Sequence, residues 1–403
     1  TRQDSGGRAH LQLGGFRYIS EEGARNALEY RYSGCDNSLM YRYFCSPLAE
    51  VLVRWCVPIW VAPNLITCLG LLPSLLGHGL IWYYCQDLRS PCPRWSWAVV
   101  GACTFIYQTL DNMDGKQARR TGTSSPLGLM LDHGADALNI VLSTLNVMAM
   151  LQVGNAPHEC FLVYLASATP FFFATWEEYY TGSLYLGVFN GPTDGVLILC
   201  ASQLVCAFVE DYTAWWGSEV VAGTGISHRH FAIGFYLICV FGTVLANFAA
   251  VLRVAGFQAR RFGKTLLDIA PFVASLGGGG FWLLRTASGA QVFARQPRLI
   301  FWLLGFAFIK LAVHLQLAHI CGEAYRPWRR TLVFTALVLA GTSAFGAPWS
   351  GDAFWGDMTV PAGCTALLAF ACLHLIVAAT REMATVLKVC IFSISVRPPA
   401  KLA

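Results

Sequence analysis

The residues best suited to chemistry are four aspartates that stand within apolar stretches of the chain: Asp111, Asp114, Asp132 and Asp136. A carboxylate inside a hydrocarbon layer costs about 3 kcal/mol unless it is paired or binds a metal. Carboxylate oxygens without accompanying Cys or His ligands suit a hard cation such as Mg²⁺ or Mn²⁺. The sequence therefore predicts a divalent-cation site. Two such ions would fit four carboxylates and would together clamp a pyrophosphate.

Helical spacing explains how these carboxylates could meet. Asp111 and Asp114 stand at i and i+3, and Asp132 and Asp136 at i and i+4, so each pair occupies one face of a helix. The connection between the pairs, 121–126, is short, which predicts two antiparallel neighbouring helices. We expect both acidic faces to converge near one end of this hairpin.

Small residues accompany the acids on or beside the same faces, namely Gly115, Ala118 and Gly128. Without bulk, they would let a flat base or a pyrophosphate approach the helix backbone. The alternative is ordinary close packing of membrane helices through small residues. Beside four aspartates we favour the ligand.

The same residues complete a longer pattern that begins at Asp111, D-x-x-D-G-x-x-A-R-x8-G-x3-D-x3-D. This pattern resembles the signature of the CDP-alcohol phosphotransferase family. Further segments are similar to the eukaryotic choline and ethanolamine phosphotransferases: 28–33, 62–67, 115–121, 125–128 and 175–182. The resemblance is strongest over 28–191.

The resemblance implies Mg²⁺ or Mn²⁺ on the four aspartates and a CDP-alcohol held by the first half of the motif and by the first span. Carried over, the nucleotide and phosphate contacts are Asn64, Gly115, Lys116, Ala118, Arg119 and Gly128. Side-chain chemistry agrees with this assignment, because the guanidinium of Arg119 can fork onto phosphate oxygens. The amide of Asn64 can bind a base or a sugar.

A hydroxyl that attacks phosphorus must lose its proton, and His133 is the best neutral-pH base near the acids. On a helix its side chain points about 100° away from that of Asp132, towards the side of the metal site. Asp136 is the alternative base, since the last motif aspartate often has that role in the family. A third interpretation makes His133 an interfacial histidine beside lipid headgroups.

A second candidate site combines acids and aromatic rings at the end of a predicted span: Trp176, Glu177, Glu178 and Tyr180. Such groups bind a quaternary or primary ammonium, as in an alcohol headgroup. The alternative is an interfacial aromatic belt with solvated acids. The sequence supports the two interpretations about equally.

The elements that position these residues are membrane helices. Hydrophobic residues make up 55% of the chain and charged residues 13%, about half the charge of an average soluble domain. We predict an all-α polytopic membrane protein with about ten spans, preceded by an interfacial amphipathic helix at 46–60. The spans are 64–84, 95–110, 127–151, 159–176, 196–209, 231–254, 266–284, 299–320, 331–345 and 364–379.

Basic loop residues set the expected orientation. Clusters near Arg119, Arg260, Arg329 and Lys388 occupy alternate connections, which the positive-inside rule assigns to the cytosol. We therefore expect both termini and the site to be cytosolic. The expected organisation is a cytosolic segment 1–45, an interfacial helix with catalytic helices 46–255, C-terminal spans 256–380 and a cytosolic tail 381–403.

The resemblance implies transfer of phosphocholine or phosphoethanolamine from CDP-choline or CDP-ethanolamine to diacylglycerol, with CMP released. Alternatives are another alcohol or acceptor (inositol, glycerol phosphate or ceramide) or, more remotely, an ion transporter with intramembrane acids. We expect membrane lipids and no nucleic acid as partners, and the sequence leaves a homodimer open. The expected location is the endoplasmic reticulum, with the Golgi as the alternative.

Overall fold

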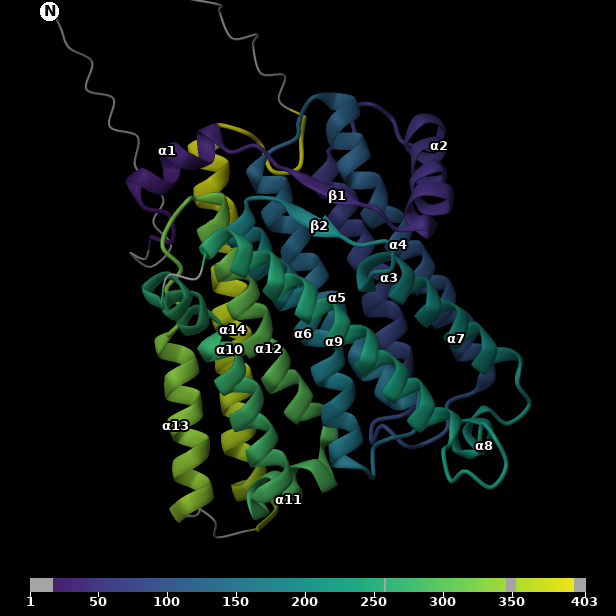
Figure 1. The fold of residues 1–403 in the computed structure, drawn as a ribbon. Coiled ribbons are helices and arrows are strands. Elements are labelled where there is room, and N and C mark those ends of the chain that lie inside the picture. Colours follow the sequence, from purple (N-terminus) through teal and green to yellow (C-terminus); the bar gives the residue numbers. More distant parts are fainter. Residues whose placement is uncertain (1–16, 257–258, 346–352, 395–403) are drawn as a thin grey trace, which may run out of the picture.

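A computed structural model describes residues 17–256, 259–345 and 353–394, and within these ranges the chain is almost entirely helical (Figure 1). The N-terminal expectation for 1–16 and the tail beyond 394 lie outside the described residues. The helices are α1 (Glu21–Glu29), α2 (Ser46–Cys56), α3 (Pro63–Tyr84), α4 (Arg94–Thr121), α5 (Pro126–Met150), α6 (Pro157–Thr181), α7 (Val196–Phe208), α8 (Tyr212–Gly217), α9 (His228–Ala255), α10 (Ala259–Arg285), α11 (Ala287–Arg295), α12 (Pro297–Ile320), α13 (Arg330–Phe345) and α14 (Ala353–Leu387). Short strands β1 (Gly34–Asp36) and β2 (Leu184–Leu186) pair in parallel, and π-helical turns lead into α2 and α7.

Each of the ten predicted spans coincides with a helix, and the all-α polytopic class is confirmed. Within the described residues, six helices are long and apolar enough to cross a membrane. These are α3, α7 together with the π-helical turn before it, α9, α10, α12 and α14. The acid-bearing helices α4, α5 and α6 are long enough but more polar, because they carry the candidate sites.

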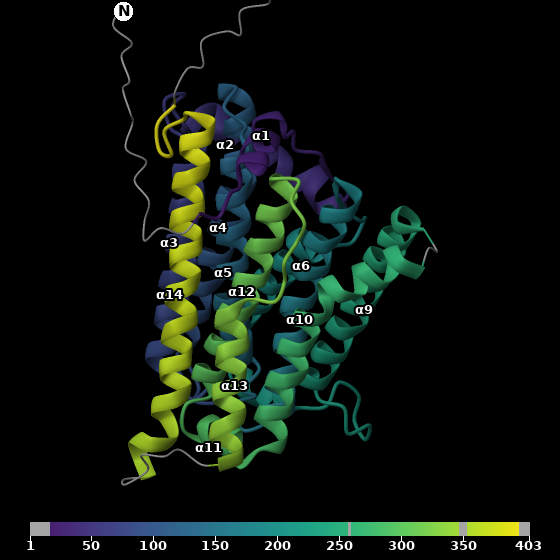
Figure 2. The same cartoon turned by 90° about the vertical axis from the view of Figure 1, so that its left-hand side faces the viewer.

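The structure shifts some predicted boundaries and keeps others. α4 continues past the predicted end of its apolar span at position 110 to Thr121, so the first half of the motif is helical throughout, as the spacing of its acids predicted. α2 ends at Cys56, before the predicted end at position 60. α13, with 16 residues and about 24 Å of helix, agrees with the predicted span 331–345 to within one residue, and the connection from α12 descends along the bundle before α13 begins (Figure 2).

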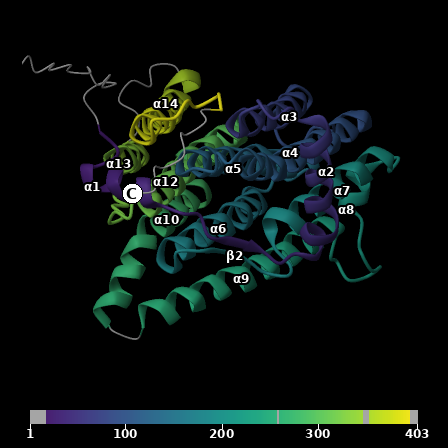
Figure 3. The ribbon, with the colours of Figure 1, turned by 90° about the horizontal axis from the view of Figure 1, so that it is seen from above.

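The interior is organised around α12, most of whose residues are buried. Seen from above, α5 and α6 lie beside α12, while α3 and α4 flank α5 on one side and α9 and α10 lie beyond α6 (Figure 3). Because α3 packs against both α4 and α5, the hairpin that carries the motif is held by a third helix.

The N-terminal segment 17–38 forms a strap across one end of the bundle. The carboxylate of Glu382 accepts hydrogen bonds from the backbone N–H groups of Tyr18 (3.0 Å) and Ile19 (3.0 Å). Farther along, β1 pairs with β2, and the Asp36 carboxylate accepts hydrogen bonds from Asn190 (2.9 Å) and Thr193 (2.7 Å). The strap thus joins α14 to the α6–α7 connection.

The two ends of the bundle give a direct test of orientation. We expect a cysteine introduced at Glu22, in the strap, to react with an impermeant thiol reagent from the cytosolic side only. A cysteine introduced at Thr224, in the α8–α9 connection at the opposite end of the bundle, should react from the lumenal side only. The exposed cysteines Cys35, Cys56 and Cys390 would first be changed to serine. Labelling of sealed membrane vesicles, with permeabilised vesicles as the control, measures this. Reaction of both sites from one side would contradict the arrangement.

Candidate active site

The α4–α5 turn places the two halves of the motif opposite each other. α4 ends at Gly122, whose φ of 67° is left-handed and reverses the chain without steric cost. α5 begins with Pro126 in its first turn, and the Ser125 hydroxyl caps it by accepting the Gly128 N–H at 3.3 Å. The acidic faces of α4 and α5 therefore start from one short, well-capped turn.

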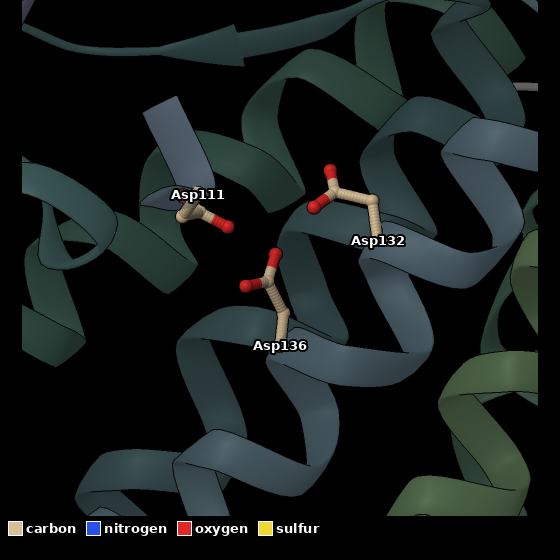
Figure 4. Close-up of side chains that lie close together, drawn as sticks. All are labelled: Asp111, Asp132 and Asp136. Carbon is tan, nitrogen blue, oxygen red and sulfur yellow. The ribbon is translucent and has the colours of Figure 1, made fainter. Parts of the chain in front are cut away.

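Three of the four motif aspartates meet. Asp111 on α4 points towards Asp132 and Asp136 on α5 (Figure 4), and one oxygen of each lies within 4.8 Å of the other two. Oδ1 of Asp132 is buried and has no hydrogen-bond partner among the described residues. Converging oxygen ligands with an unsatisfied acceptor fit a hard cation such as Mg²⁺ or Mn²⁺.

Neutral hydroxyl groups orient two of the carboxylates. The Tyr107 hydroxyl donates to Asp136 at 2.5 Å, and the Thr67 hydroxyl on α3 donates to Asp114. Asp114 is therefore held towards α3, beside the group of three and not within it. Tyr107 and Thr67 were not recognised from the sequence, because hydroxyl residues in apolar helices carry no distinctive spacing.

The aspartates lie at a cavity of about 290 Å³ at the strap end of the bundle. Its lining includes Asp111, Asp114 and Asp132, together with five of the six predicted nucleotide contacts: Asn64, Gly115, Ala118, Arg119 and Gly128. A cavity of this size, with a few convergent polar groups and the cationic side chain of Arg119, is typical of a small-ligand site. Carboxylates and a guanidinium together could bind a metal–pyrophosphate complex.

Lys116 does not line this cavity. Its ammonium donates to the Ser46 hydroxyl at 2.9 Å and forms an ion pair with Glu50 at 3.4 Å, both on α2. Arg120, four residues farther along α4, donates to the backbone carbonyls of Val53 and Val57 at the end of α2. These residues fasten the predicted interfacial helix to α4 instead of contacting a ligand.

His133 faces α6, away from the cavity lining. Its Nε2 lies 3.0 Å from the Thr175 hydroxyl, which itself donates to the Phe171 carbonyl at 2.9 Å. A hydroxyl has one proton, so Nε2 must be the donor to Thr175 and Nδ1 must hold the free lone pair. Among the described residues Nδ1 has no hydrogen-bond partner. The structure thus presents an imidazole preset to accept a proton.

The four candidate headgroup residues do not form one binding pocket, and none of them lines the 290 Å³ cavity. Trp176 is fully buried and packs edge-on against Tyr180, whose hydroxyl donates to Asp268 at 2.5 Å. Glu177 faces Asn247 on α9. Glu178 points instead towards α12, where one oxygen lies 3.6 Å from His319 Nε2.

Tyr32 of the strap links Glu178 to the cavity and was missed in the sequence. It lines the cavity, and its pKa is raised to about 12, first by burial of its hydroxyl and then by the carboxylates of Glu178 and Asp132. The rest of the side chain is open, since Tyr32 is 52% exposed overall. The charges of Glu178 and Asp132 therefore both act on this one hydroxyl group.

Fold and site together define a class: a polytopic membrane protein with a group of buried carboxylates beside a polar cavity. The sequence model of the CDP-alcohol phosphatidyltransferase family matches residues 60–221. The chain is 32% identical over 355 residues to choline/ethanolaminephosphotransferase 1 of Arabidopsis thaliana, covering 82% of this chain and 89% of that one. It is 34% identical over 200 residues to choline/ethanolaminephosphotransferase 1 of Saccharomyces cerevisiae, about half of each chain.

A CDP-alcohol phosphatidyltransferase class-I family protein of Dictyostelium discoideum is 36% identical over 294 residues, which covers 73% of this chain and 68% of that one. The chain therefore belongs to the CDP-alcohol phosphatidyltransferase family and is an enzyme of that class. The resemblance predicted from the aspartate motif is confirmed.

The carboxylate group predicts the effect of removing one charge. Asp111→Asn and Asp132→Asn keep the side-chain shape but each remove one negative ligand, so we expect loss of Mn²⁺ binding and of at least about 99% of CMP release. Electron paramagnetic resonance titration of Mn²⁺ measures binding separately from activity. Chelation should stop the wild-type reaction, and added Mg²⁺ or Mn²⁺ should restore it.

The matched control is Asp211→Asn, at the opposite end of the bundle. Asp211 caps α8, and asparagine caps a helix equally well. This variant should bind Mn²⁺ and turn over as the wild type does. Full activity in Asp111→Asn or Asp132→Asn would rule out the metal site.

Proposed function

We propose that the chain transfers phosphocholine or phosphoethanolamine from its CDP derivative to the hydroxyl of diacylglycerol, producing a phospholipid and CMP. The observation that carries the proposal is the meeting of Asp111, Asp132 and Asp136, two of which, Asp111 and Asp132, line a cavity that Arg119 and Asn64 also line. The names of the plant and yeast relatives supply the substrate class.

The aspartates would hold one or two Mg²⁺ or Mn²⁺ ions, which when bound would neutralise the charge of the pyrophosphate. Arg119 is placed to bind phosphate oxygens, and its guanidinium can use two N–H groups at once. Gly128 keeps the wall next to Asn64 open, since a Cβ there would lie 3.3 Å from Asn64 Oδ1. These residues bind and orient the CDP-alcohol.

In the reaction, the diacylglycerol oxygen forms a bond to the β-phosphorus. The bond from that phosphorus to the bridging oxygen breaks, and CMP leaves with the electron pair. The hydroxyl proton passes to Nδ1 of His133, the free nitrogen of the ring that Thr175 orients. Asp136 is the alternative acceptor, although its carboxylate is engaged by Tyr107.

Glu178 is the best placed of the candidate headgroup residues. It is 1% exposed, and neither of its oxygens has a hydrogen-bond partner among the described residues. A buried carboxylate with no hydrogen bond and a histidine contact at 3.6 Å favours a cationic ligand, and the choline or ethanolamine ammonium has the required charge. Tyr32, near both Glu178 and Asp132, would lie between the two ends of the transferred group.

The location expected for this activity is the endoplasmic reticulum or, alternatively, the Golgi, with the cavity open to the cytosol. CDP-alcohols are charged and water-soluble, so the strap end of the bundle must face the compartment that contains them. The diacylglycerol acceptor would reach the His133 side of the site from the membrane.

A CMP-release assay on the purified protein in lipid tests the function. We expect release from CDP-choline or CDP-ethanolamine only when diacylglycerol and Mg²⁺ or Mn²⁺ are both present, because the acceptor supplies the nucleophile. Inositol, glycerol phosphate and ceramide serve as competing acceptors. CMP release that depends on one of these acceptors instead of diacylglycerol would show that the enzyme uses the alternative substrate class.

The base assignment is tested by separating binding from turnover. His133→Ala should lower kcat by about 10²–10⁴-fold and leave the affinities for Mn²⁺ and CMP nearly unchanged, because a base acts on the acceptor proton in the transition state. Thr175→Val, which removes the hydroxyl that orients the ring, should lower kcat by about tenfold with little change in KM.

The control for Thr175→Val is Thr175→Ser, which keeps the hydroxyl and should recover most of kcat. Equal losses in the valine and serine variants would assign Thr175 a packing role. A kcat within about twofold of wild type in His133→Ala would move the base to Asp136.

A further inference from the structure

The segment after α14 returns to the cavity instead of leaving the protein. At Lys388 the backbone has a φ of 53°, a left-handed conformation that reverses the chain, and the Val389 N–H donates to the Ala384 carbonyl at 3.1 Å. Residues 389–394, called here the tail segment, then run along the cavity. Its lining includes Val389, Cys390, Ile391, Ser393 and Ile394.

The tail segment binds one of the predicted nucleotide contacts. Asn64 Nδ2, in the first turn of α3, donates to the backbone carbonyl of Ile391 at 2.7 Å. The other side of the same amide faces Gly128 on α5. A side-chain amide can rotate by 180° and exchange the positions of its NH₂ donor and its oxygen acceptor. The Ile391 carbonyl can only accept a hydrogen bond, so the Asn64 NH₂ group must point towards it. This contact therefore fixes which edge of Asn64 a ligand meets.

The tail segment lies beside the cavity without filling it. With the tail segment in place the cavity still measures about 290 Å³, close to the lower limit for small-molecule sites. Arg119, Asp111 and Asp132 remain among the lining residues. If the tail segment blocked the cavity, this space would be filled. The tail segment instead forms one side of the cavity and leaves the space open.

We propose that the tail segment 389–394 is a structural wall of the nucleotide end of the active site, with the Ile391 carbonyl positioning the Asn64 amide for the ligand. The proposal rests on the proposed function only in taking the ligand of this cavity to be a cytidine nucleotide. The segment supplies backbone polar groups and the Ser393 hydroxyl, which suit the donors and acceptors of a base or a ribose.

Two truncations form a matched pair. Ending the chain after Lys388 removes the tail segment, and ending it after Ile394 keeps the tail segment complete. We expect the shorter form to bind CMP about tenfold more weakly and to raise KM for CDP-choline by a similar factor, with kcat within about twofold. The longer form should match the wild type. Calorimetric titration with CMP and steady-state CMP release measure these values.

The coupling to Asn64 is tested by combining changes. Asn64→Ala should weaken CMP binding, and adding the Lys388 truncation to it should cost much less than the truncation costs in the wild type, because the residue that the segment positions is already gone. Fully additive losses would show that the tail segment does not act through Asn64.

Cys390 provides a measurement on the full-length chain. With the other exposed cysteines, Cys35 and Cys56, changed to serine, saturating CMP should slow alkylation of Cys390 by about fivefold or more, because bound nucleotide would cover the wall. Faster alkylation would mean that the nucleotide displaces the segment, and an unchanged rate would mean that it binds elsewhere. Either result overturns the proposal, as do equal CMP affinities in the two truncations. If the full-length protein neither binds CMP nor releases it from CDP-alcohols, the proposed function itself fails.

Discussion

The mutual repulsion of the carboxylates in the α4–α5 hairpin is the constraint on which the rest of the site depends. Two unit charges 4.8 Å apart repel by about 3.5 kcal/mol at an effective dielectric constant of about 20. Asp111, Asp132 and Asp136 form three such pairs inside a bundle of apolar helices. A bound cation would offset this repulsion, and the cavity at the strap end of the bundle gives ions and phosphates a place to enter.

The neighbours of the acids are arranged for the same reason. Tyr107 and Thr67 donate hydrogen bonds to Asp136 and Asp114 and add no charge of their own. Such donors orient a carboxylate and leave its remaining lone pairs for a metal, whereas a lysine or arginine in the same place would compete with the cation. Lys116, the nearest flexible cation on α4, is held away from the acids by Ser46 and Glu50. Thr67 and Tyr107 therefore orient carboxylates, whereas Lys116 and Arg120 fasten α2 to α4.

Much of this could be predicted from the sequence, because helical periodicity fixes which side chains share a face. The spacing of Asp132 and Asp136 predicted their shared face, and the 100° step from Asp132 to His133 predicted a histidine beside the acids. The same step explains why the headgroup residues disperse: Glu177 and Glu178 are consecutive on α6 and so face different helices, α9 and α12. Because Glu177 and Glu178 are adjacent in the sequence, they suggested one shared pocket, but consecutive residues on a helix point in different directions.

What could not be predicted comes from contacts between segments far apart in the chain and without periodicity. Tyr32 reaches the cavity only because β1 pairs with β2, about 150 residues later, and Ile391 reaches Asn64 across a sequence separation of 327. Helix packing brings both segments to the strap end of the bundle, where the backbone need not be helical because water can satisfy it. A nucleotide has many donors and acceptors, and an irregular backbone presents unpaired ones that a helix does not. Periodic helices therefore build the charged centre, while the strap and the tail segment add irregular backbone to the cavity, where the proposed nucleotide would bind.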